Sequence, residues 1–430
     1  MVEKVWTLWF TLLDNDQEIK EGTIMSTSLL YHGFSIVGYR YLSTLFENGA
    51  IFFKIKQERE KLRCPVCNKR NVIAKGKTRR KFRSLPIGKK ATWIDFDVPR
   101  VKCLTCGIVR QVKIRFADFR RTYTRAFERY ALDLSRHMTI RDVARHLNIS
   151  WDVVKDIQKR HLKKRFERPR LKDLRRIAID EISVGKGHRY LTIVLNLDSG
   201  AVVFVGHGKD ADSLSPFWKR LKYSRAKIKA VAIDMSPAYI AAALENLPDA
   251  AIVFDRFHIM KMYNDKLSGL RRKLQREAEN PLQMEVLKGT RWLLLKNREN
   301  LSPDPKKREK ERLQEALKLN EPLAKAYYLK DELRQFWEQS SKAVAEKWLE
   351  QWIQTARQTN IPMLIKMANS LEGHRYGLLN WYDYPISTGP LEGTNNKIKT
   401  MQRQAYGFRD HEFFKLKIFA LHKSRYALVG

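Results

Sequence analysis

Short apolar runs recur along the chain from about residue 176, and each ends at a turn-forming or charged group. "RIAIDEISVG" predicts a strand, and "YLTIVLNLDSG" with "AVVFVGHG" predicts a hairpin that turns at Asp198, Ser199 and Gly200. Two later runs, "AKIKAVAID" and "AAIVFD", predict strands that are each followed by a helix. Three consecutive strands followed by β-α units indicate an α/β fold with a mixed sheet covered by helices.

The pattern changes between about residues 275 and 375, where no convincing strand is found. In "LRQFWEQSSKAVAEKWLEQWIQTARQT" the apolar residues recur at helical spacing, which predicts helices. We expect the large side chains of this region to form a core rather than a base-stacking surface. They are Phe336, Trp337, Val344, Trp348 and Trp352.

Two helices joined by a short turn are predicted between Thr139 and Phe166. Thr139 can cap the first helix and Ser150 the second. Each helix has one apolar face, formed by Ile140, Val143, Ala144 and Leu147, and then by Val153, Val154, Ile157 and Leu162. A preceding helix at about 122–137 would complete a three-helix unit. The pattern is typical of a helix-turn-helix, whose second helix can enter a DNA major groove; an ordinary helical hairpin is the alternative.

The charge distribution favours DNA as the partner. The chain has 83 Lys and Arg against 47 Asp and Glu, a net charge of +36, and residues 61–170 hold 32 of the basic and 9 of the acidic residues. An excess of this size beside a helix-turn-helix is the electrostatic footprint of a double-stranded DNA-binding protein. The candidate DNA-binding residues lie on the outer face of the second helix and in its basic end: Trp151, Lys155, Gln158, Lys159, Lys163, Lys164 and Arg165.

The four cysteines form two C-x-x-C pairs, which are Cys64 with Cys67 and Cys103 with Cys106. Two such pairs supply four thiolates, the ligand set of a tetrahedral structural zinc site. The segments between the pairs resemble strands, so we expect a zinc ribbon with long hairpin arms. A redox pair or free thiols are the alternatives. Cysteines used in this way favour an intracellular protein.

No apolar run reaches the ~18 residues that a membrane-spanning helix needs, so we expect no membrane partner. The apolar N-terminal segment has no small-residue cleavage site after it, which argues against a signal peptide. A second methionine, Met25, follows it. We hypothesise that residues 1–24 are an extension upstream of the functional chain.

Two of the predicted strands end in carboxylates, Asp180 after "IAI" and Asp234 after "VAI". A buried carboxylate needs a cation, hydrogen-bond donors or a metal ion. Neighbouring residues on a strand point to opposite faces, so at most one of Asp180 and Glu181 should join Asp234, and Asp180 is preferred. For either aspartate alone, capping the next helix is the alternative.

A third carboxylate, Glu392, is predicted on a late helix that Ser387 or Thr388 can cap. The residues on its face, at i+3, i+4 and i+7, are Asn395, Asn396 and Lys399. Three carboxylates can hold two divalent cations, and oxygen ligands suit Mg²⁺ or Mn²⁺.

These parts, in this order, resemble the DDE-type transposases of bacterial insertion sequences, in particular the ISL-three family. The matching segments are the cysteine pairs, the helix-turn-helix, "IAIDEIS", "VAIDMSPAY", "VFDRFHIMKM" and "GPLEGTNNKIK", from about Ser26 to the C-terminus. The resemblance implies an RNase H-like catalytic domain with an all-helical insertion and a metal-binding catalytic triad. The triad maps to Asp180, Asp234 and Glu392.

The resemblance also singles out residues around the triad. Asp255 and His258 match a family motif and would assist near the metals; the alternative is that Asp255 caps a helix and His258 packs. Asn395, Asn396 and Lys399 would contact DNA near the cleaved bond.

The predicted fold is therefore multidomain α/β, with an N-terminal zinc ribbon, a helix-turn-helix and an RNase H-like catalytic domain that carries an all-helical insertion. The expected boundaries are 1–24 for the extension, 25–120 for the zinc ribbon, 121–170 for the helix-turn-helix, 171–275 and 376–430 for the two parts of the catalytic domain, and 276–375 for the insertion.

The predicted function is that of a transposase that binds the terminal inverted repeats of its element and catalyses two-metal DNA cleavage and strand transfer. We expect catalytic Mg²⁺ or Mn²⁺, structural Zn²⁺, and at least a dimer on DNA in the bacterial cytoplasm. The alternatives are a zinc-containing DNA-binding regulator with an inactive RNase H-like domain, and a metal-dependent DNA nuclease.

Overall fold

The computed structural model describes residues 28–185, 187, 189–304 and 306–422, and the chain divides into two compact units, residues 1–157 and 158–430. The hypothesised extension, residues 1–24, lies outside the described residues.

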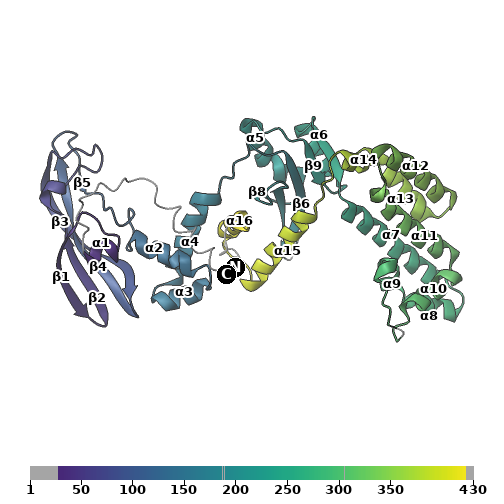
Figure 1. The fold of residues 1–430 in the computed structure, drawn as a ribbon, viewed down its shortest axis with the longest axis horizontal. Helices are drawn as coiled ribbons and strands as arrows, with labels where there is room; N and C mark the ends of the chain where they lie inside the picture. The colour runs from purple at the N-terminus through teal and green to yellow at the C-terminus, as the bar shows by residue number, and fades with distance from the viewer. Residues whose placement is uncertain (1–27, 186, 188, 305, 423–430) are drawn as a thin grey trace, which may run out of the picture. The chain divides into compact units, whose positions relative to one another are not determined.

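The first unit begins with a five-stranded sheet whose strands follow the order β1-β2-β4-β3, with β5 beside β4 (Figure 1). Its elements are α1 (Leu29–His32), β1 (Arg40–Glu47), β2 (Ala50–Lys56), β3 (Val72–Ile87), β4 (Lys90–Cys103) and β5 (Val109–Gln111). β3 and β4 form the long antiparallel hairpin between the cysteine pairs. Alternate residues of β4, namely Ile94, Phe96 and Val98, are fully buried and form the centre of this sheet's core.

Three helices follow the sheet in the chain: α2 (Arg125–Leu134), α3 (Ile140–Leu147) and α4 (Trp151–Phe166). The Thr139 hydroxyl accepts a hydrogen bond from the backbone N–H of Asp142 and so caps α3. Asn148 ends α3 in the left-handed conformation, and the Ser150 hydroxyl accepts from the N–H of Asp152 at the start of α4. Val143, Val154 and Ile157 are fully buried. The predicted three-helix unit, with its turn at Asn148–Ser150, is confirmed.

The second unit is built on a five-stranded mixed sheet with the order β10-β9-β6-β7-β8. Its strands are β6 (Arg176–Gly185), β7 (Arg189–Asn196), β8 (Val202–His207), β9 (Ala230–Ile233) and β10 (Ala251–Phe254). The first three are antiparallel neighbours, and β9 and β10 run parallel to β6. This is the mixed sheet predicted from three consecutive strands and two β-α units, and it is the sheet of an RNase H-like domain.

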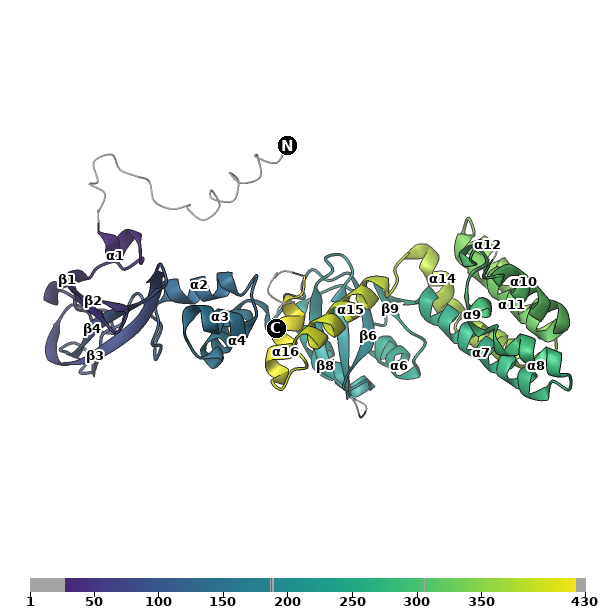
Figure 2. The same cartoon turned by 90° about the horizontal axis from the view of Figure 1, so that it is seen from below.

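Helices cover both faces of this sheet. On one face, α5 (Ser215–Ser224), α6 (Pro237–Asn246) and α7 (Arg256–Glu277) pack on strand residues such as Ile179 and Ile233. On the other face, α15 (Gly389–Gln404) and α16 (His411–Ala420) pack on Ala178 and Ala232, and Figure 2 shows α15 lying across the strands. The alternation of strand residues between the two cores assigns each side chain to a face.

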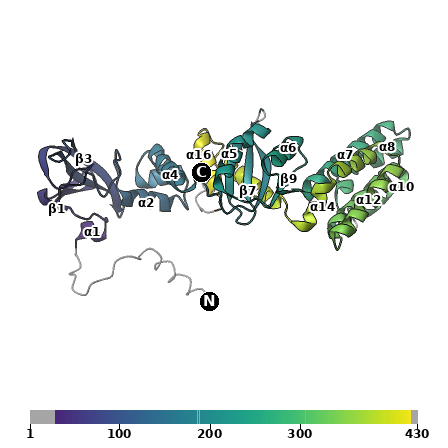
Figure 3. The ribbon, with the colours of Figure 1, turned by 90° about the horizontal axis from the view of Figure 1, so that it is seen from above.

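After β10, the described residues up to 422 contain helices and no strand. Those of the insertion form a bundle (Figure 3) and are α8 (Pro281–Lys288), α9 (Arg291–Leu295), α10 (Glu309–Leu319), α11 (Glu321–Gln335), α12 (Lys342–Gln358) and α13 (Pro362–Gly373). The next helix, α14 (Arg375–Asp383), packs on β10. Phe336, Trp337 and Trp352 are buried as predicted. Val344 was expected in this core, and that expectation was wrong, because its side chain is 43% exposed. The buried face of α12 begins at the next residue, Ala345.

Candidate active site

The four cysteine sulfurs are gathered at one end of the β3–β4 hairpin. The Sγ atoms of Cys64 and Cys106 are 3.6 Å apart, those of Cys67 and Cys103 are 3.5 Å apart, and all four lie within 4.8 Å of one another. Antiparallel pairing of Val72 with Cys103 brings the two pairs together although 35 residues separate them in the sequence. Four thiols in such a group fit a tetrahedral structural zinc site.

Each cysteine pair is shaped by a tight turn. The N–H of Asn68 bonds the carbonyl of Cys64, and the N–H of Gly107 bonds the carbonyl of Cys103. Asn68 and Gly107 both have a positive φ, 60° and 71°, which these residue types tolerate. The N–H groups of Cys106 and Thr105 lower the pKa of the Cys103 thiol to about 6, so the thiolate that binds zinc is favoured.

The candidate DNA-binding residues of α4 divide into two groups. Trp151 is 54% exposed, and Lys164 and Arg165 are exposed as predicted. Gln158, however, is 3% exposed, so the expectation that it lies on the outer face was wrong. Gln158 follows the fully buried Ile157, so two consecutive residues of α4 are covered at this turn. The apolar pattern predicted the burial of Ile157 but not that of Gln158.

Lys159 and Lys163, also on α4, form ion pairs within the second unit. The Nζ of Lys159 is 3.1 Å from a carboxylate oxygen of Asp410 and 2.7 Å from one of Glu412, at the start of α16. The Nζ of Lys163 is 3.0 Å from the other Glu412 oxygen. Both lysines were expected to be available to DNA, and in this structure both are paired with acidic side chains.

Strand register places the aspartates of the second unit side by side. In the parallel pair β6–β9, Ala178 is opposite Ala232, so continuing the register by two residues sets Asp180 opposite Asp234. In β9–β10, Ile233 is opposite Phe254, so Asp255 follows at the same level. The parity of the strands puts all three aspartates on the face covered by α15.

Helix α15 is bonded to the outer two of these aspartates. Before its first residue, the Thr388 hydroxyl donates to the Asp255 carboxylate at 2.6 Å, and two turns later the Asn395 amide donates to Asp180 at 2.9 Å. Since β9 is the middle strand, α15 passes over Asp234 between these two bonds. Glu392 lies between Thr388 and Asn395 on α15, within about 60° of both around the helix axis.

The carboxylates of this cluster carry uncompensated negative charge. Burial raises the pKa of Asp180 to about 6, with a further rise from Glu181 and Asp234 and an opposing effect of His258. Burial, and then Asp234, also raise the pKa of Glu181. Burial raises the pKa of the Tyr239 hydroxyl well above its ordinary value; the Thr192 hydroxyl, 3.2 Å away, opposes this rise, and the nearby carboxylates add to it.

Glu392 is not part of this cluster in the structure. Its side chain is exposed, and among the described residues the four cysteines are the only group of three or more His, Cys, Asp or Glu side chains with ligand atoms within 4.8 Å. The structure therefore brings Asp180 and Asp234 together and leaves Glu392 beside them on α15.

The residues fit divalent cations on chemical grounds. Asp180 and Asp234 supply carboxylate oxygens, and one further oxygen on their side of the sheet, Oδ1 of Asn395, is buried without a hydrogen-bond partner among the described residues. Buried oxygen atoms of this kind are costly unless a donor or cation meets them. A hard cation with oxygen ligands, such as Mg²⁺ or Mn²⁺, matches this donor set.

The alternatives raised by the sequence have mixed outcomes. The Asp234 carboxylate accepts a bond from the N–H of Ser236 at 2.9 Å, which forms a turn before α6; the N-cap residue of α6 is Ser236 and no side chain caps this helix. Asp255 precedes α7 but makes no side-chain cap; it accepts the Thr388 bond instead, so the capping alternative was wrong. Thr388 likewise precedes α15 without capping it. His258 is half-buried, and its charge acts on Asp180 and Glu181.

Sequence reasoning missed Tyr239 and set Glu181 aside. Glu181 points away from Asp180, yet it remains electrostatically coupled to Asp234. Tyr239 lies in "VAIDMSPAY", five residues after Asp234, and no residue-type rule marked it. Its position in the first turn of α6, directly after the Asp234 strand, is the signal that could have found it.

Lys399 lines a separate open pocket beyond the end of β6. This pocket is also lined by Gly185, Gln402, Arg403 and Tyr406. Asn396 and Lys399 are exposed, whereas Asn395 is 6% exposed and faces Asp180. The three α15 residues proposed to touch DNA therefore occupy two different environments.

Three family models match the chain. One described as "Transposase", for the ISL3 DDE domain, covers residues 177–418, one described as the helix-turn-helix domain of transposase family ISL3 covers 112–162, and one described as the zinc-finger of transposase IS204/IS1001/IS1096/IS1165 covers 60–106.

Curated relatives agree with these models. The transposase for insertion sequence element IS1001 of Bordetella parapertussis is 32% identical over 363 residues, 83% of this chain and 88% of that protein. The transposase for IS1557 of Mycobacterium tuberculosis is 30% identical over 374 residues, 81% of this chain and 82% of that protein. A solved Drosophila P element transposase strand transfer complex has a TM-score of 0.32 at 12% identity, covering 60% of this chain and 79% of that one, which is too low to support an argument. None of the helices within the described residues has the length and apolar character to cross a membrane.

Proposed function

Because the chain belongs to the ISL3 family of DDE transposases, we propose that it binds the terminal inverted repeats of its own insertion sequence and catalyses metal-dependent cleavage and strand transfer of those ends. The family membership establishes a transposase with a helix-turn-helix; the substrate sequence, the metal and the catalytic residues belong to the proposal.

The ribbon and the helix-turn-helix would read the ends. The exposed ring of Trp151 and the half-buried Lys155 lie at the N-terminal part of α4, the part of a recognition helix that contacts base edges. Lys164 and Arg165 would contact phosphates and fix the position of the helix on the duplex. The net charge of +36 supports a large electrostatic share of the affinity.

Asp180, Asp234 and Glu392 would hold two divalent cations. The observation that carries this assignment is the strand register, which sets Asp180 opposite Asp234 while the bonds from Thr388 and Asn395 hold α15 above them. Glu392 stands one turn from Asn395, but its side chain is exposed. The proposal therefore requires Glu392 to change rotamer and reach the cations, which its three rotatable side-chain bonds allow. Two such cations supply, when bound, activation of the attacking oxygen and stabilisation of the leaving oxygen.

The chemistry is a pair of phosphoryl transfers on DNA. In the first, a water oxygen bonds to phosphorus at the element end and the 3′-oxygen leaves with a proton as a free 3′-OH. In the second, that 3′-OH attacks a target phosphodiester, so one P–O bond forms as one breaks. No covalent link between DNA and the chain is needed. Asn395 would hold the Asp180 carboxylate in orientation throughout, as its hydrogen bond does here.

Joining two ends to one target requires at least two copies of the active site, so we propose at least a dimer on DNA. Structural zinc in the ribbon would keep the DNA-reading part folded.

The test is an assay with labelled duplexes that contain or lack the element's terminal repeats, with Mg²⁺, Mn²⁺ or EDTA. The proposal expects metal-dependent cuts at the repeat end and joined products on a target plasmid. Binding without cutting in either metal would favour a DNA-binding regulator. Cutting without any joined product would favour a nuclease.

A further inference from the structure

Six exposed cations gather at the edge of the catalytic sheet that lies away from the carboxylates. We call this group the basic edge; it consists of Lys172, Arg175, Arg176, Arg225, Lys227 and Lys229. They line two adjoining open pockets that share Asp173, Arg175 and Lys229, the first with a volume of about 510 Å³.

The basic edge is built by two segments that the sheet brings together. Arg176 is the first residue of β6 and is paired in register with Ala230, the first residue of β9. The N–H of Lys229 bonds the carbonyl of Arg175 at 2.7 Å, so the segment before β6 and the loop before β9 are tied backbone to backbone. Because β6 and β9 are parallel, these cations share one edge of the sheet.

Buried leucines and an isoleucine fix the backbone beneath the cations. Leu171, Leu174 and Ile228 are 5%, 1% and 8% exposed and belong to the core under α5 and α6. Upstream, the Arg220 side chain of α5 donates to the carbonyl of Pro169, which holds the incoming chain against the domain. The cations are therefore displayed on a backbone of fixed course, so less ordering is required when a ligand binds.

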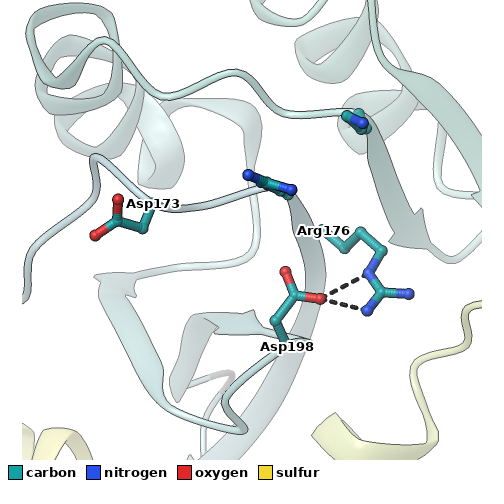
Figure 4. A pocket seen from close by; sticks show the side chains of 5 residues that line it. Asp173, Arg176 and Asp198 are labelled. Atoms are coloured by element: carbon teal, nitrogen blue, oxygen red, sulfur yellow. Dashed lines mark hydrogen bonds and ion pairs between the residues drawn. The ribbon is translucent and has the colours of Figure 1, made fainter.

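The charge of the basic edge is only partly neutralised. Arg176 donates through Nε to the Asp198 carboxylate at 2.7 Å, and Figure 4 shows this pair with Asp173 standing apart from it. Within the described part of the chain, Asp173 and Asp198 are the only acidic residues that line the two pockets, against six cations. An open, cation-lined surface suits a phosphodiester backbone.

The basic edge is distinct from the catalytic cluster. Arg176 precedes Asp180 by four residues of one strand, a separation of roughly 13 Å at about 3.3 Å per residue. Lys229 similarly precedes Asp234 by the length of β9. A phosphate held at this edge is therefore not the phosphate that reacts.

We infer that the basic edge is a second DNA-backbone site, which holds double-stranded DNA through its phosphates at a distance from the reacting bond. The inference rests on the proposed DNA substrate. The duplex held there is either the element end, beyond the part read by α4, or the target; both present the same phosphate chemistry.

The experiment compares the full-length wild type with the triple variant Arg175→Gln, Lys227→Gln and Lys229→Gln. The matched control is Lys307→Gln, Lys310→Gln and Lys318→Gln, which removes the same charge from exposed positions of the helical insertion. Affinity is measured from 50 to 300 mM salt on a duplex with the terminal repeat and on one without it. Each lost phosphate contact should lower the slope of log K against log salt by about 0.9.

We expect the triple variant to lose one to three such contacts and about tenfold or more in affinity at low salt, with the control near wild type. Loss on both duplexes assigns the site to target or general DNA, and loss confined to the repeat duplex assigns it to the element end. An unchanged slope on both duplexes, or an equal change in the control, would overturn the inference.

Two further readouts separate the inference from other failures. Thermal unfolding checks that the triple variant folds, and the single variant Lys227→Gln repeats the comparison with minimal disturbance. Single-turnover cleavage at saturating DNA should be unchanged; a loss of rate with unchanged affinity would contradict a binding role. If the wild type binds DNA but never cuts it, the proposed function fails while the slope comparison still decides the basic edge.

Discussion

The two metal-binding regions proposed for this chain differ in how complete their ligand sets are. The four cysteine sulfurs of the ribbon already lie within 4.8 Å of one another. The catalytic carboxylates do not: Asp180 and Asp234 are neighbours by strand register, and Glu392 stands exposed on α15. The ribbon site is built on one hairpin, whereas the carboxylate site draws on elements more than 200 residues apart in sequence.

This difference teaches how each site depends on its ligand. The sheet that carries the cysteines has its own core around Ile94, Phe96 and Val98, so the metal would chiefly stabilise the two cysteine turns at the end of the β3–β4 hairpin. The carboxylates lie on a sheet that helices cover on both faces, so the fold persists without metal. Without metal, the cost of burying these carboxylates appears as the raised pKa values of Asp180 and Glu181.

The largest effect is expected for Cys103→Ser. Apparent zinc-binding free energies of about 10–16 kcal/mol in small zinc peptides indicate that the cysteine end of the ribbon would lose its local fold with its metal. We expect loss of one zinc per chain by mass spectrometry, and protease cleavage within residues 60–110. The neighbouring Val66→Ser, at a 55% exposed position, should keep both properties. Retention of zinc and protease resistance by Cys103→Ser would show that the ribbon does not depend on this site.

The next largest effect separates Glu392 from Glu181 as the third carboxylate. Glu392→Gln should slow single-turnover cleavage at least about 100-fold, or about 2.7 kcal/mol in activation free energy, without changing thermal stability, because its side chain is exposed. Glu181→Gln should change the rate only a few-fold, since Glu181 points to the other face of the sheet. The reverse order of effects would assign the metal to Glu181.

A smaller effect concerns pH and the Asp180 carboxyl. Its pKa is raised from 3.8 to about 6, so the folded state binds its proton more tightly than the unfolded state does. The metal-free protein should therefore lose stability from this group as pH rises from about 4 through about 6, by at most roughly 3 kcal/mol. Asp180→Asn removes this loss, and an Asn395 amide flip would present its unpaired Oδ1 to the new NH₂ group.

Chemical denaturation at pH 4 and pH 7, without metal, checks this prediction. The variant should be more stable than wild type only at pH 7, and added Mg²⁺ should stabilise wild type more than the variant. The exposed Asp249→Asn serves as the control. A variant that is less stable than wild type at pH 7 would show that the ionised Asp180 carboxylate does not destabilise the metal-free protein.

The smallest effect is expected for Tyr239→Phe. The change removes a buried hydroxyl that is 3.2 Å from Thr192, at a cost of about 1 kcal/mol in the free energy of unfolding. Cleavage should fall less than about fivefold, because the ring still packs below the carboxylates. Tyr223→Phe, at an 88% exposed position, should change neither. A large loss of activity with little loss of stability would make Tyr239 a positioning residue for the site.

Local patterns predicted the parts of the fold that local chemistry decides. The cysteine spacing predicted the zinc ribbon, and the caps at Thr139 and Ser150 predicted the helix-turn-helix. The apolar runs predicted the mixed sheet, because strands that are apolar on both faces occur in sheets that are covered on both sides.

Contacts between distant segments were not predictable in this way. The pairing of Lys159 with Asp410 and Glu412, the burial of Gln158, and the bond from Thr388 to Asp255 each depend on which helix lies where. An aspartate before a helix, such as Asp255, is the right residue type either to cap that helix or to accept a bond from another element, and sequence alone does not decide between the two. The roles of Asp180, Asp234 and Glu392 stay predictions until their variants are assayed.

The most direct test of the central claim is single-turnover cleavage of repeat-end DNA by Asp234→Asn, at saturating DNA with Mg²⁺. Asparagine keeps an oxygen for the N–H of Ser236, so a purely capping Asp234 would lose nothing. The metal-ligand account predicts cleavage at least about 1,000-fold slower, about 4 kcal/mol in activation free energy, with DNA affinity within about twofold of wild type. Cleavage at a rate close to wild type would contradict it.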